Sequence, residues 1–259
     1  MNRFILLGTQ RTGSSALAKL INLHPTILCG LEWTQKVSRK KKISATANLL
    51  SANFQSLNGF HKEYVDKKYS NSAKLKWIGF KTLFSSSNKW IIHPRYSIAL
   101  WVDQLKEHLE WLKSNRDIHI IHIVRNHNLE WLKSLFLAKT TMLYSGKKYP
   151  KGFTVAIDTK QAIYRLKSKN WIDRCISTLD ASNPYCLLTY EEFKSNNVET
   201  AKKVANFLNC NDKIEIEYFD AVKQSKGDAK DYISNYSQLF EALQQRKLLF
   251  SDNDHHERS

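Results

Sequence analysis

Residues Gly8 to Ser15 place two glycines, several hydroxyls and one arginine in a short stretch that suits anion binding. The apolar run from Phe4 to Leu7 predicts a buried strand before it, and the glycines at 8 and 13 let the backbone turn tightly. Ser14 and Ser15 are expected to cap the helix that follows. Because the first N–H groups of a helix have no partners within it, this arrangement predicts a site for a phosphate or sulfate.

The cation of this loop is Arg11, whose planar guanidinium can hold a phosphate or sulfate through two donors. The spacing from Gly8 to Gly13 and Ser14 matches the frame of the phosphate loop of nucleoside triphosphatases. In that motif, the position of Ser14 is a lysine that reaches the outer phosphates. A phosphotransferase of the kinase or NTPase class is therefore the weaker alternative, and ATP binding with magnesium would revive it.

A second group of polar side chains follows the strongest strand pattern of the chain, Ile118 to Val124. Arg125 leaves the end of this strand, and Ser134 lies on the helix predicted to follow it. Open α/β sheets bind ligands at the carboxyl ends of their strands, so both side chains are expected to face one phosphate there. Two anchors at two strand ends suit a ligand with two phosphate groups.

The elements that must position these anchors alternate between strands and helices, which predicts βαβ architecture. Three further strands are expected: within Leu23–Thr34, where the strand ends at Glu32, within Lys74–Phe84, and at Tyr185–Thr189. Helical patterns cover residues 96–114, 129–137, 157–179, 191–208 and 236–249.

These elements predict one α/β domain over residues 1–250, with a mainly parallel central sheet flanked by helices. Residues 34–75 and 144–156 are expected to form excursions on the acceptor side of a substrate cleft. Residues 251–259 are polar and are predicted to be a disordered tail.

The composition indicates which kinds of molecule the chain is expected to bind. Forty lysines and arginines against 24 acidic residues give a formal charge of +16, which favours an anionic partner such as a polyphosphorylated nucleotide or an acidic glycan. The lysines are scattered and no nucleic-acid-binding signature accompanies them, so nucleic acid is not expected. Charge alone leaves open a second alternative, a non-catalytic protein that binds an acidic polymer.

The four cysteines, Cys29, Cys175, Cys186 and Cys210, are widely spaced without a CxxC pair, so neither a zinc site nor a disulfide framework is predicted. A reduced, cytoplasmic setting is the simplest interpretation. The apolar run before Gly8 is too short for a signal-peptide core, and no stretch reaches membrane-spanning length. We expect a soluble chain, and the sequence leaves homo-oligomerisation open.

The segment Gln10 to Ser15 resembles the [KR]-[ST]-G-[ST]-[ST] loop of sulfotransferases that use 3′-phosphoadenosine 5′-phosphosulfate (PAPS), and His119–Lys139 resembles the element of that family that binds the 3′-phosphate. Four more segments are similar to the family's HP…GE, GFK, YE.F and I.NY..L motifs. They are LHPTILCGLE, WIGFKTLF, PYCLLTYEEF and DYISNYSQLFEAL. The nearest resemblance is to bacterial carbohydrate sulfotransferases of the trehalose and nodulation-factor type.

This resemblance implies a P-loop NTPase-like sulfotransferase fold and transfer of a sulfuryl group from PAPS to a hydroxyl of a carbohydrate or glycolipid, by in-line displacement and without a metal. Arg125 and Ser134 would bind the 3′-phosphate, and Arg11 would stabilise charge on the leaving phosphate. The 5′-phosphosulfate would be held by Gln10, Arg11, Thr12, Gly13, Ser14 and Ser15.

A base must accept the proton of the acceptor hydroxyl. Glu32 is the first choice, because a carboxylate near the loop can reach the acceptor and the resembling trehalose-type enzymes use a glutamate in this segment. His93 and His61 are rival bases. For Lys81 the favoured prediction is a side chain that extends from the strand end to solvent, with a cleft-facing position as the alternative.

Overall fold

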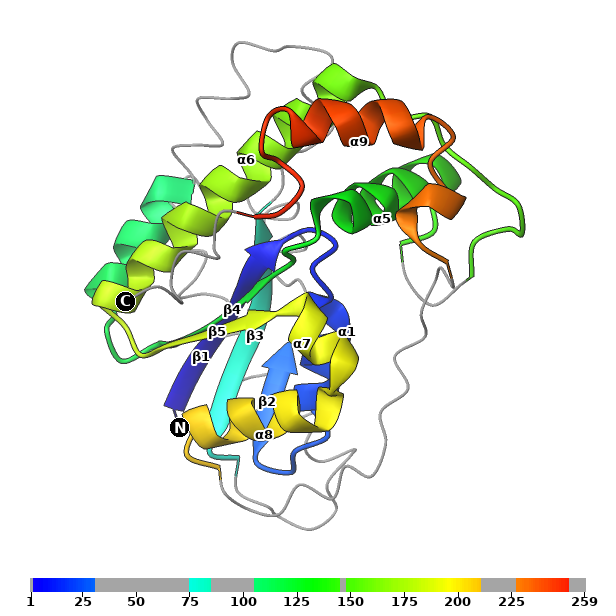
Figure 1. Cartoon of the computed structure of the whole chain (residues 1–259). Coiled ribbons are helices and arrows are strands. Elements are labelled where there is room, and N and C mark those ends of the chain that lie inside the picture. Colours follow the sequence, from blue (N-terminus) through cyan, green and yellow to red (C-terminus); the bar gives the residue numbers. More distant parts are fainter. Residues whose placement is uncertain (1, 31–74, 85–104, 145–147, 211–226, 252–259) are drawn as a thin grey trace.

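Five parallel strands form the centre of the described structure, in the order β2-β3-β1-β4-β5 (Figure 1). The computed structural model describes residues 2–30, 75–84, 105–144, 148–210 and 227–251. The predicted fold class, one α/β domain with a mainly parallel sheet, is confirmed. The strands are β1 (Asn2–Thr9), β2 (Ile27–Gly30), β3 (Trp77–Phe84), β4 (His119–Val124) and β5 (Tyr185–Thr189).

The middle strand, β1, sends alternate side chains into two apolar layers. Phe4 and Leu6 pack in the layer that also contains Leu17, whereas Ile5 and Leu7 pack in the layer on the opposite face. Each layer is buried beneath helices, as a parallel sheet requires, and this explains why the strand is a continuous apolar run in the sequence.

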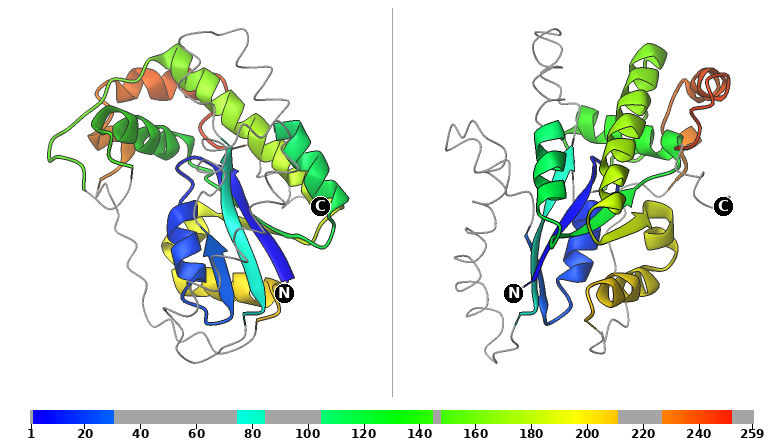
Figure 2. Two further views of the ribbon diagram at one scale, coloured as in Figure 1. Left: turned by 180° about the vertical axis from the view of Figure 1, so that it is seen from behind. Right: turned by 90° about the vertical axis from the view of Figure 1, so that its left-hand side faces the viewer.

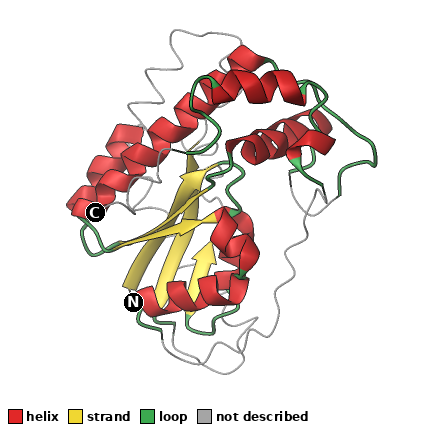
Figure 3. Ribbon diagram, viewed as in Figure 1, coloured by secondary structure: helices red, strands yellow, loops and turns green. Residues whose placement is uncertain are grey.

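Helices cover both faces of the sheet and its carboxyl edge (Figures 2 and 3). One face carries α1, α7 and α8, and the other carries α6 and the helical residues 105–114. Beyond the carboxyl ends of the strands, α5 and α9 pack with the first half of α6 in a third apolar cluster. The bounds are α1 (Ser14–Ile21), α5 (Asn128–Thr141), α6 (Thr159–Ser177), η2 (Thr178–Ala181), α7 (Tyr190–Ser195), α8 (Asn197–Phe207), η3 (Ala229–Asp231) and α9 (Tyr236–Gln244).

Two helix predictions differ from the structure. The pattern over 191–208 predicted one helix, but the chain forms α7 and α8 on either side of Asn196, whose backbone is extended with φ −147° and ψ 90°. The Asn196 side chain accepts from the Glu199 amide and caps α8. The last helix, α9, ends at Gln244 rather than at residue 249, because the backbone turns left-handed at Lys247 with φ 54°.

The end of the described chain, residues 248–251, returns to the turn after β4. The Asn128 amide donates to the Leu249 carbonyl at 3.1 Å, and the Ser251 amide donates to the Asn126 carbonyl at 3.1 Å. Ser251 is only 3% exposed, although the sequence placed it at the start of the tail. The rest of the predicted tail lies outside the described residues.

A buried ionic cluster joins α6 to β4. Asp173 Oδ2 lies 3.2 Å from Lys169 Nζ, and Asp173 Oδ1 lies 3.6 Å from His122 Nε2. Burial acts to raise the pKa of Asp173, but the charge of Lys169 and the neighbouring His122 outweigh it, so the pKa lies below its ordinary value. The stability that this carboxylate contributes is therefore present above about pH 4 and is lost as the pH falls through the native pKa.

We expect Asp173→Asn to destabilise the protein by about 3–5 kcal/mol at pH 7, because Lys169 would remain buried without its counter-charge. Asp117→Asn is the control, since Asp117 pairs with Arg3 at 2.6 Å on the surface, with side chains 63% and 35% exposed. Its expected cost is about 0–1 kcal/mol. Urea unfolding measures both variants.

Equal losses in the two variants would contradict the role of the buried pair. The difference between the wild type and Asp173→Asn is also expected to shrink as the pH is lowered below about 4, since the wild-type carboxylate then becomes protonated.

Candidate active site

The loop between β1 and α1 turns sharply at the carboxyl edge of the sheet. Arg11 and Gly13 both have left-handed backbones, with φ 67° and φ 83°. Thr12 Oγ1 donates to the Thr9 carbonyl at 2.9 Å and closes the turn from inside. From α5, Trp131 Nε1 donates to the carbonyl of Gln10 at 2.7 Å. The predicted phosphate loop is therefore held both by itself and by the helix beyond it.

The first turn of α1 directs its N–H groups at this loop. Gly13 is the N-cap residue and has no side-chain cap, so the predicted serine cap is wrong. Ser14 and Ser15 are the first residues of the helix, and the first amide that bonds back to the Gly13 carbonyl is that of Ala16, at 3.0 Å. Within the described chain the earlier amides have no such bond, which is the condition for binding an anion at a helix start.

Lys81 lies directly beside this helix start. It is in register with Leu6 of β1, it is 2% exposed, and its Nζ donates to Ser15 Oγ at 2.7 Å. The prediction that Lys81 extends to solvent is therefore wrong, because the parallel register turns its side chain under the loop. A buried ammonium at this position adds positive charge where the helix already favours an anion.

The two anchors predicted from separate parts of the sequence meet at Arg11 and Ser134. Arg11 Nε donates to Ser134 Oγ at 3.0 Å, although the two residues are 123 positions apart. The same guanidinium donates to the Tyr144 carbonyl at 2.6 Å and to the Tyr149 hydroxyl at 3.4 Å. Burial lowers the pKa of Arg11, and the neighbouring tyrosines partly offset this.

Arg125 occupies the other side of the loop. It is 6% exposed, and its Nη1 donates to the Arg11 carbonyl at 3.2 Å, while Nη2 lies 3.5 Å from Glu130 Oε2. Its guanidinium also stacks on the ring of Tyr190, with 4.3 Å between the guanidinium carbon and the ring centroid. Arg125 Nε is buried and has no hydrogen-bond partner among the described residues. A buried donor of this kind requires an acceptor that the described chain does not supply.

Tyr190 is a site residue that our sequence analysis did not single out. Its ring packs against Arg125 and against Gly13, where an added Cβ would lie 2.6 Å from Tyr190 Cδ2. The sequence signal is the TYEEF segment, in which the tyrosine directly follows β5 and begins α7. Residues that follow parallel strands gather at one edge of a sheet, and this rule would have included Tyr190.

Several predicted site residues lie outside the described residues. These are the candidate base Glu32 and its rivals His61 and His93. Residues 34–74, which make up nearly all of one predicted excursion, also lie there. The described site therefore consists of the loop, α1, the end of β3, and the turn and helix after β4.

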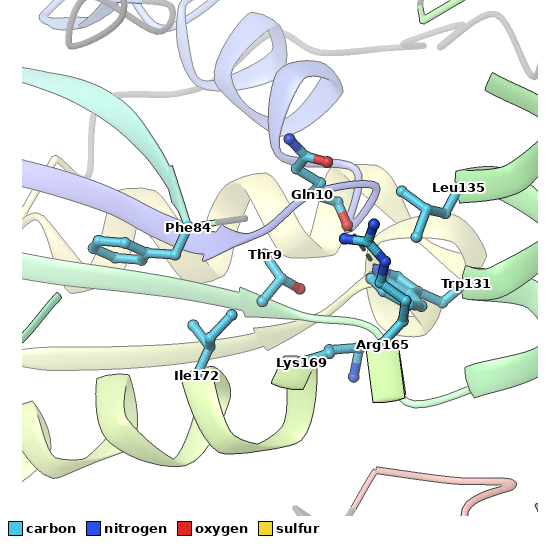
Figure 4. A pocket seen from close by; sticks show the side chains of 8 residues that line it. All are labelled: Thr9, Gln10, Phe84, Trp131, Leu135, Arg165, Lys169 and Ile172. Carbon is cyan, nitrogen blue, oxygen red and sulfur yellow. Dashed lines mark hydrogen bonds between the residues drawn. The ribbon is translucent and has the colours of Figure 1, made fainter. Parts of the chain in front are cut away.

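A small pocket opens beside the loop, on the face of the sheet that α6 covers (Figure 4). Side chains from β1, β3, α5 and α6 line it, and Trp131 provides both a wall of the pocket and the hydrogen bond to the Gln10 carbonyl. The lining residues are Thr9, Gln10, Phe84, Trp131, Leu135, Arg165, Lys169 and Ile172.

The described residues contain no group of three or more His, Cys, Asp or Glu side chains arranged to hold a metal ion. Burial raises the pKa of the Cys29 thiol to about 12 and that of Cys186 to about 11, so both thiols are protonated at neutral pH. Among the helices that the structure describes, none combines the length and the apolar character needed to cross a membrane.

A family model of the Sulfotransferase family matches residues 3–213 of the chain, a range that includes the loop, β4 and Ser134. The chain belongs to the sulfotransferase family. No curated protein matches this sulfotransferase.

Among solved structures, the sulfotransferase is similar to one from Alicyclobacillus acidocaldarius, with 11% identity, a TM-score of 0.46, and coverage of 95% of this chain and 94% of that one. It is also similar to the sulfotransferase domain of the Synechococcus PCC 7002 olefin synthase, with 15% identity, a TM-score of 0.43, and coverage of 95% and 87%. A third similar structure is sulfotransferase STF9 from Mycobacterium avium, with 11% identity, a TM-score of 0.44, and coverage of 95% of this chain and 76% of that one.

The contact between Gly13 and Tyr190 can be tested against a second left-handed glycine. Gly152 has φ 74° and an added Cβ there would have no neighbour within 4 Å, whereas Gly13 has φ 83° and faces the Tyr190 ring. Alanine at either position carries left-handed strain of about 1–2 kcal/mol. Only Gly13→Ala adds a clash, so we expect it to be less stable than Gly152→Ala by a further 1–3 kcal/mol or so in urea unfolding. Equal stability of the two variants would contradict this contact.

Proposed function

We propose that this sulfotransferase transfers a sulfuryl group from PAPS to a hydroxyl of a carbohydrate or glycolipid acceptor. The observation that carries the proposal is the hydrogen bond from Arg11 Nε to Ser134 Oγ, at 3.0 Å. It joins the loop suited to a 5′-phosphosulfate to the helix suited to a 3′-phosphate. A ligand with two separated phosphate groups fits such a pair of anchors better than a triphosphate does.

The first anchor would hold the 5′-phosphosulfate. We assign this role to Gln10, Arg11, Thr12, Gly13, Ser14 and Ser15, through their amides, hydroxyls and one guanidinium. The uncapped start of α1 supports the assignment, since its amides point at the loop. Lys81, whose ammonium bonds to Ser15 Oγ at 2.7 Å, would add a second positive charge to the same group.

The second anchor would hold the 3′-phosphate between Arg125 and Ser134. The residues fit this group, because Arg125 is buried against Tyr190 and its Nε has no partner among the described residues. A phosphate oxygen would provide the missing acceptor, and a charged hydrogen bond of this type is stronger than a neutral one. Tyr190 would keep the guanidinium plane in place.

When bound, PAPS supplies a sulfuryl group whose bond to the 5′-phosphate breaks as the acceptor oxygen bonds to sulfur. Arg11 and the loop amides would stabilise the negative charge that grows on the phosphate side. The acceptor proton must pass to a base, for which Glu32 stays our first proposal, with His93 and His61 as rivals. The chain needs no redox group of its own for this transfer.

The acceptor class rests on sequence resemblance alone. The LHPTILCGLE segment and its glutamate resemble the trehalose and nodulation-factor type of carbohydrate sulfotransferase. We further propose that residues 34–75 and 144–156 contact the acceptor. A cytoplasmic location is part of the same proposal, since PAPS would have to be available to the protein.

Calorimetric titration with three nucleotides tests the donor. We expect tight binding of 3′-phosphoadenosine 5′-phosphate (PAP) and much weaker binding of adenosine 5′-phosphosulfate, which lacks the 3′-phosphate. ATP with magnesium should also bind weakly. A preference for ATP would favour a phosphotransferase, and absence of binding to every nucleotide would favour a binder of acidic polymers.

Substitution of the two arginines separates their roles. Arg125→Ala is expected to weaken PAP binding by about 1.5–3 kcal/mol, because a set of charged hydrogen bonds is lost. Arg11→Ala is expected to lower turnover by about 10²–10³-fold while changing PAP affinity less, since its charge is needed most in the transition state. Calorimetry and a sulfuryl-transfer assay measure the two effects.

Arg246→Ala is the control for both variants, because Arg246 is a surface arginine whose guanidinium donates to the Ala242 carbonyl of α9, away from the loop. It should leave binding and turnover unchanged. Equal losses of binding and turnover in Arg11→Ala and Arg125→Ala would contradict the separate roles.

A further inference from the structure

We propose that Ser251, held by the buried Lys169, is a positioning residue for the turn that carries Arg125. Through this turn the C-terminal segment would set the preference for nucleotides that bear a 3′-phosphate. This inference rests on the function proposed above and adds to it two residues far from the loop in sequence.

The contacts of Ser251 join it to two residues of the turn after β4 and to the first residue of α5. Its Oγ lies 3.2 Å from the Arg125 carbonyl and 3.4 Å from Asn128 Oδ1, and its amide donates to the Asn126 carbonyl at 3.1 Å. Asn128 is fully buried and donates Nδ2 to the Leu248 carbonyl at 3.1 Å. The C-terminal segment is therefore bonded to the Arg125 carbonyl and to the two residues, Asn126 and Asn128, that lie just after it.

Lys169 determines which way the Ser251 hydroxyl points. Lys169 Nζ donates to Ser251 Oγ at 2.6 Å, so the hydroxyl accepts from the ammonium and must direct its single proton elsewhere. The nearest acceptors for that proton are the Arg125 carbonyl and the Asn128 side-chain oxygen. An ammonium is a strong donor, which makes this chain of bonds more directional than neutral contacts would be.

The ammonium is itself fixed by buried charges and not by solvent. Lys169 and Asp173 are each 1% exposed and lie 3.2 Å apart, and Asp173 also faces His122. His122 Nδ1 in turn lies 2.6 Å from the Tyr185 hydroxyl, so the cluster spans α6, β4 and β5. A fully buried ion pair stabilises a fold poorly unless its geometry is well satisfied, and it can specify one arrangement of its surroundings.

The effect of this chain of bonds should fall on the 3′-phosphate anchor. The loop has separate supports, from Thr12 to the Thr9 carbonyl and from Trp131 to the Gln10 carbonyl. Arg125, in contrast, would direct a buried guanidinium toward the 3′-phosphate from a turn that Ser251 holds by hydrogen bonds. A small displacement of such a donor weakens its hydrogen bonds steeply.

The test is calorimetric titration of the full chain with PAP and with adenosine 5′-monophosphate, which differ only by the 3′-phosphate. Ser251→Ala is expected to weaken PAP binding by about three- to tenfold and to change binding of the monophosphate by less than about twofold. Ser251→Cys, whose thiol is a poor hydrogen-bonding group of similar shape, should shift the affinity ratio in the same direction and serves if the alanine variant does not fold.

Ser182→Ala is the matched control. Its hydroxyl also lies near a backbone carbonyl and an asparagine side-chain oxygen, those of Leu179 at 3.2 Å and Asn183 at 2.8 Å, but it precedes β5 at the opposite edge of the sheet. This variant should leave the affinity ratio of the two nucleotides at the wild-type value.

Three outcomes decide the matter. A ratio of PAP affinity to monophosphate affinity that falls only in the Ser251 variants supports the inference. A wild-type ratio in those variants, or an equal loss for both nucleotides, would overturn the positioning role while leaving the proposed function intact. Failure of the wild type to prefer PAP over the monophosphate would overturn the proposed function and the inference with it.

Discussion

The left-handed turn at Arg11 and Gly13 is the constraint on which the site depends. It stops β1 at Thr9, starts α1 at Ser14 without a side-chain cap, and sends the Arg11 side chain across the carboxyl edge of the sheet. A residue other than glycine at position 13 would meet the Tyr190 ring. Through this one turn, a few residues build an uncapped helix start suited to an anion and place a guanidinium near Ser134.

The other charged side chains of the site are each hydrogen-bonded to, or packed against, neighbouring groups of the protein. Arg125 is sandwiched between Tyr190 and the loop, and Lys81 is buried beneath Ser15. On the α6 face, Asp173 balances the buried Lys169, whose ammonium donates a hydrogen bond to Ser251 in the C-terminal segment. The sheet thus separates a layer of cations suited to bind a ligand from an ionic cluster whose partners are other side chains of the protein.

Much of the fold was predictable, because strands buried on both faces are apolar throughout. Each of the described strands overlaps a predicted one, and the strand-turn-helix pattern at Gly8–Ser15 is present, although its serine cap is not. Helix ends were less predictable, because a single residue such as Asn196 can stop one helix and cap the next through its own side chain. Ser251 could not be recognised as buried, since its partners Lys169 and Arg125 are brought to it only by the tertiary fold.

For the site, the sequence identified the residues better than it identified the directions in which their side chains point. Arg125 and Ser134 were chosen because they follow a strand, and the structure brings both close to Arg11. Lys81 was misjudged because the direction of a strand side chain depends on its register with a neighbouring strand, which a local pattern does not contain. Glu32 lies outside the described residues, so its role as base rests on resemblance.

The most direct measurement is a crystal structure of the protein with PAP bound. We predict that the 5′-phosphate lies against the amides at the start of α1, within hydrogen-bond distance of Arg11 or Lys81. The 3′-phosphate should contact Arg125 and Ser134 and should accept a hydrogen bond from Arg125 Nε. A nucleotide bound in the reverse direction, or at a site away from the loop between β1 and α1, would contradict the account.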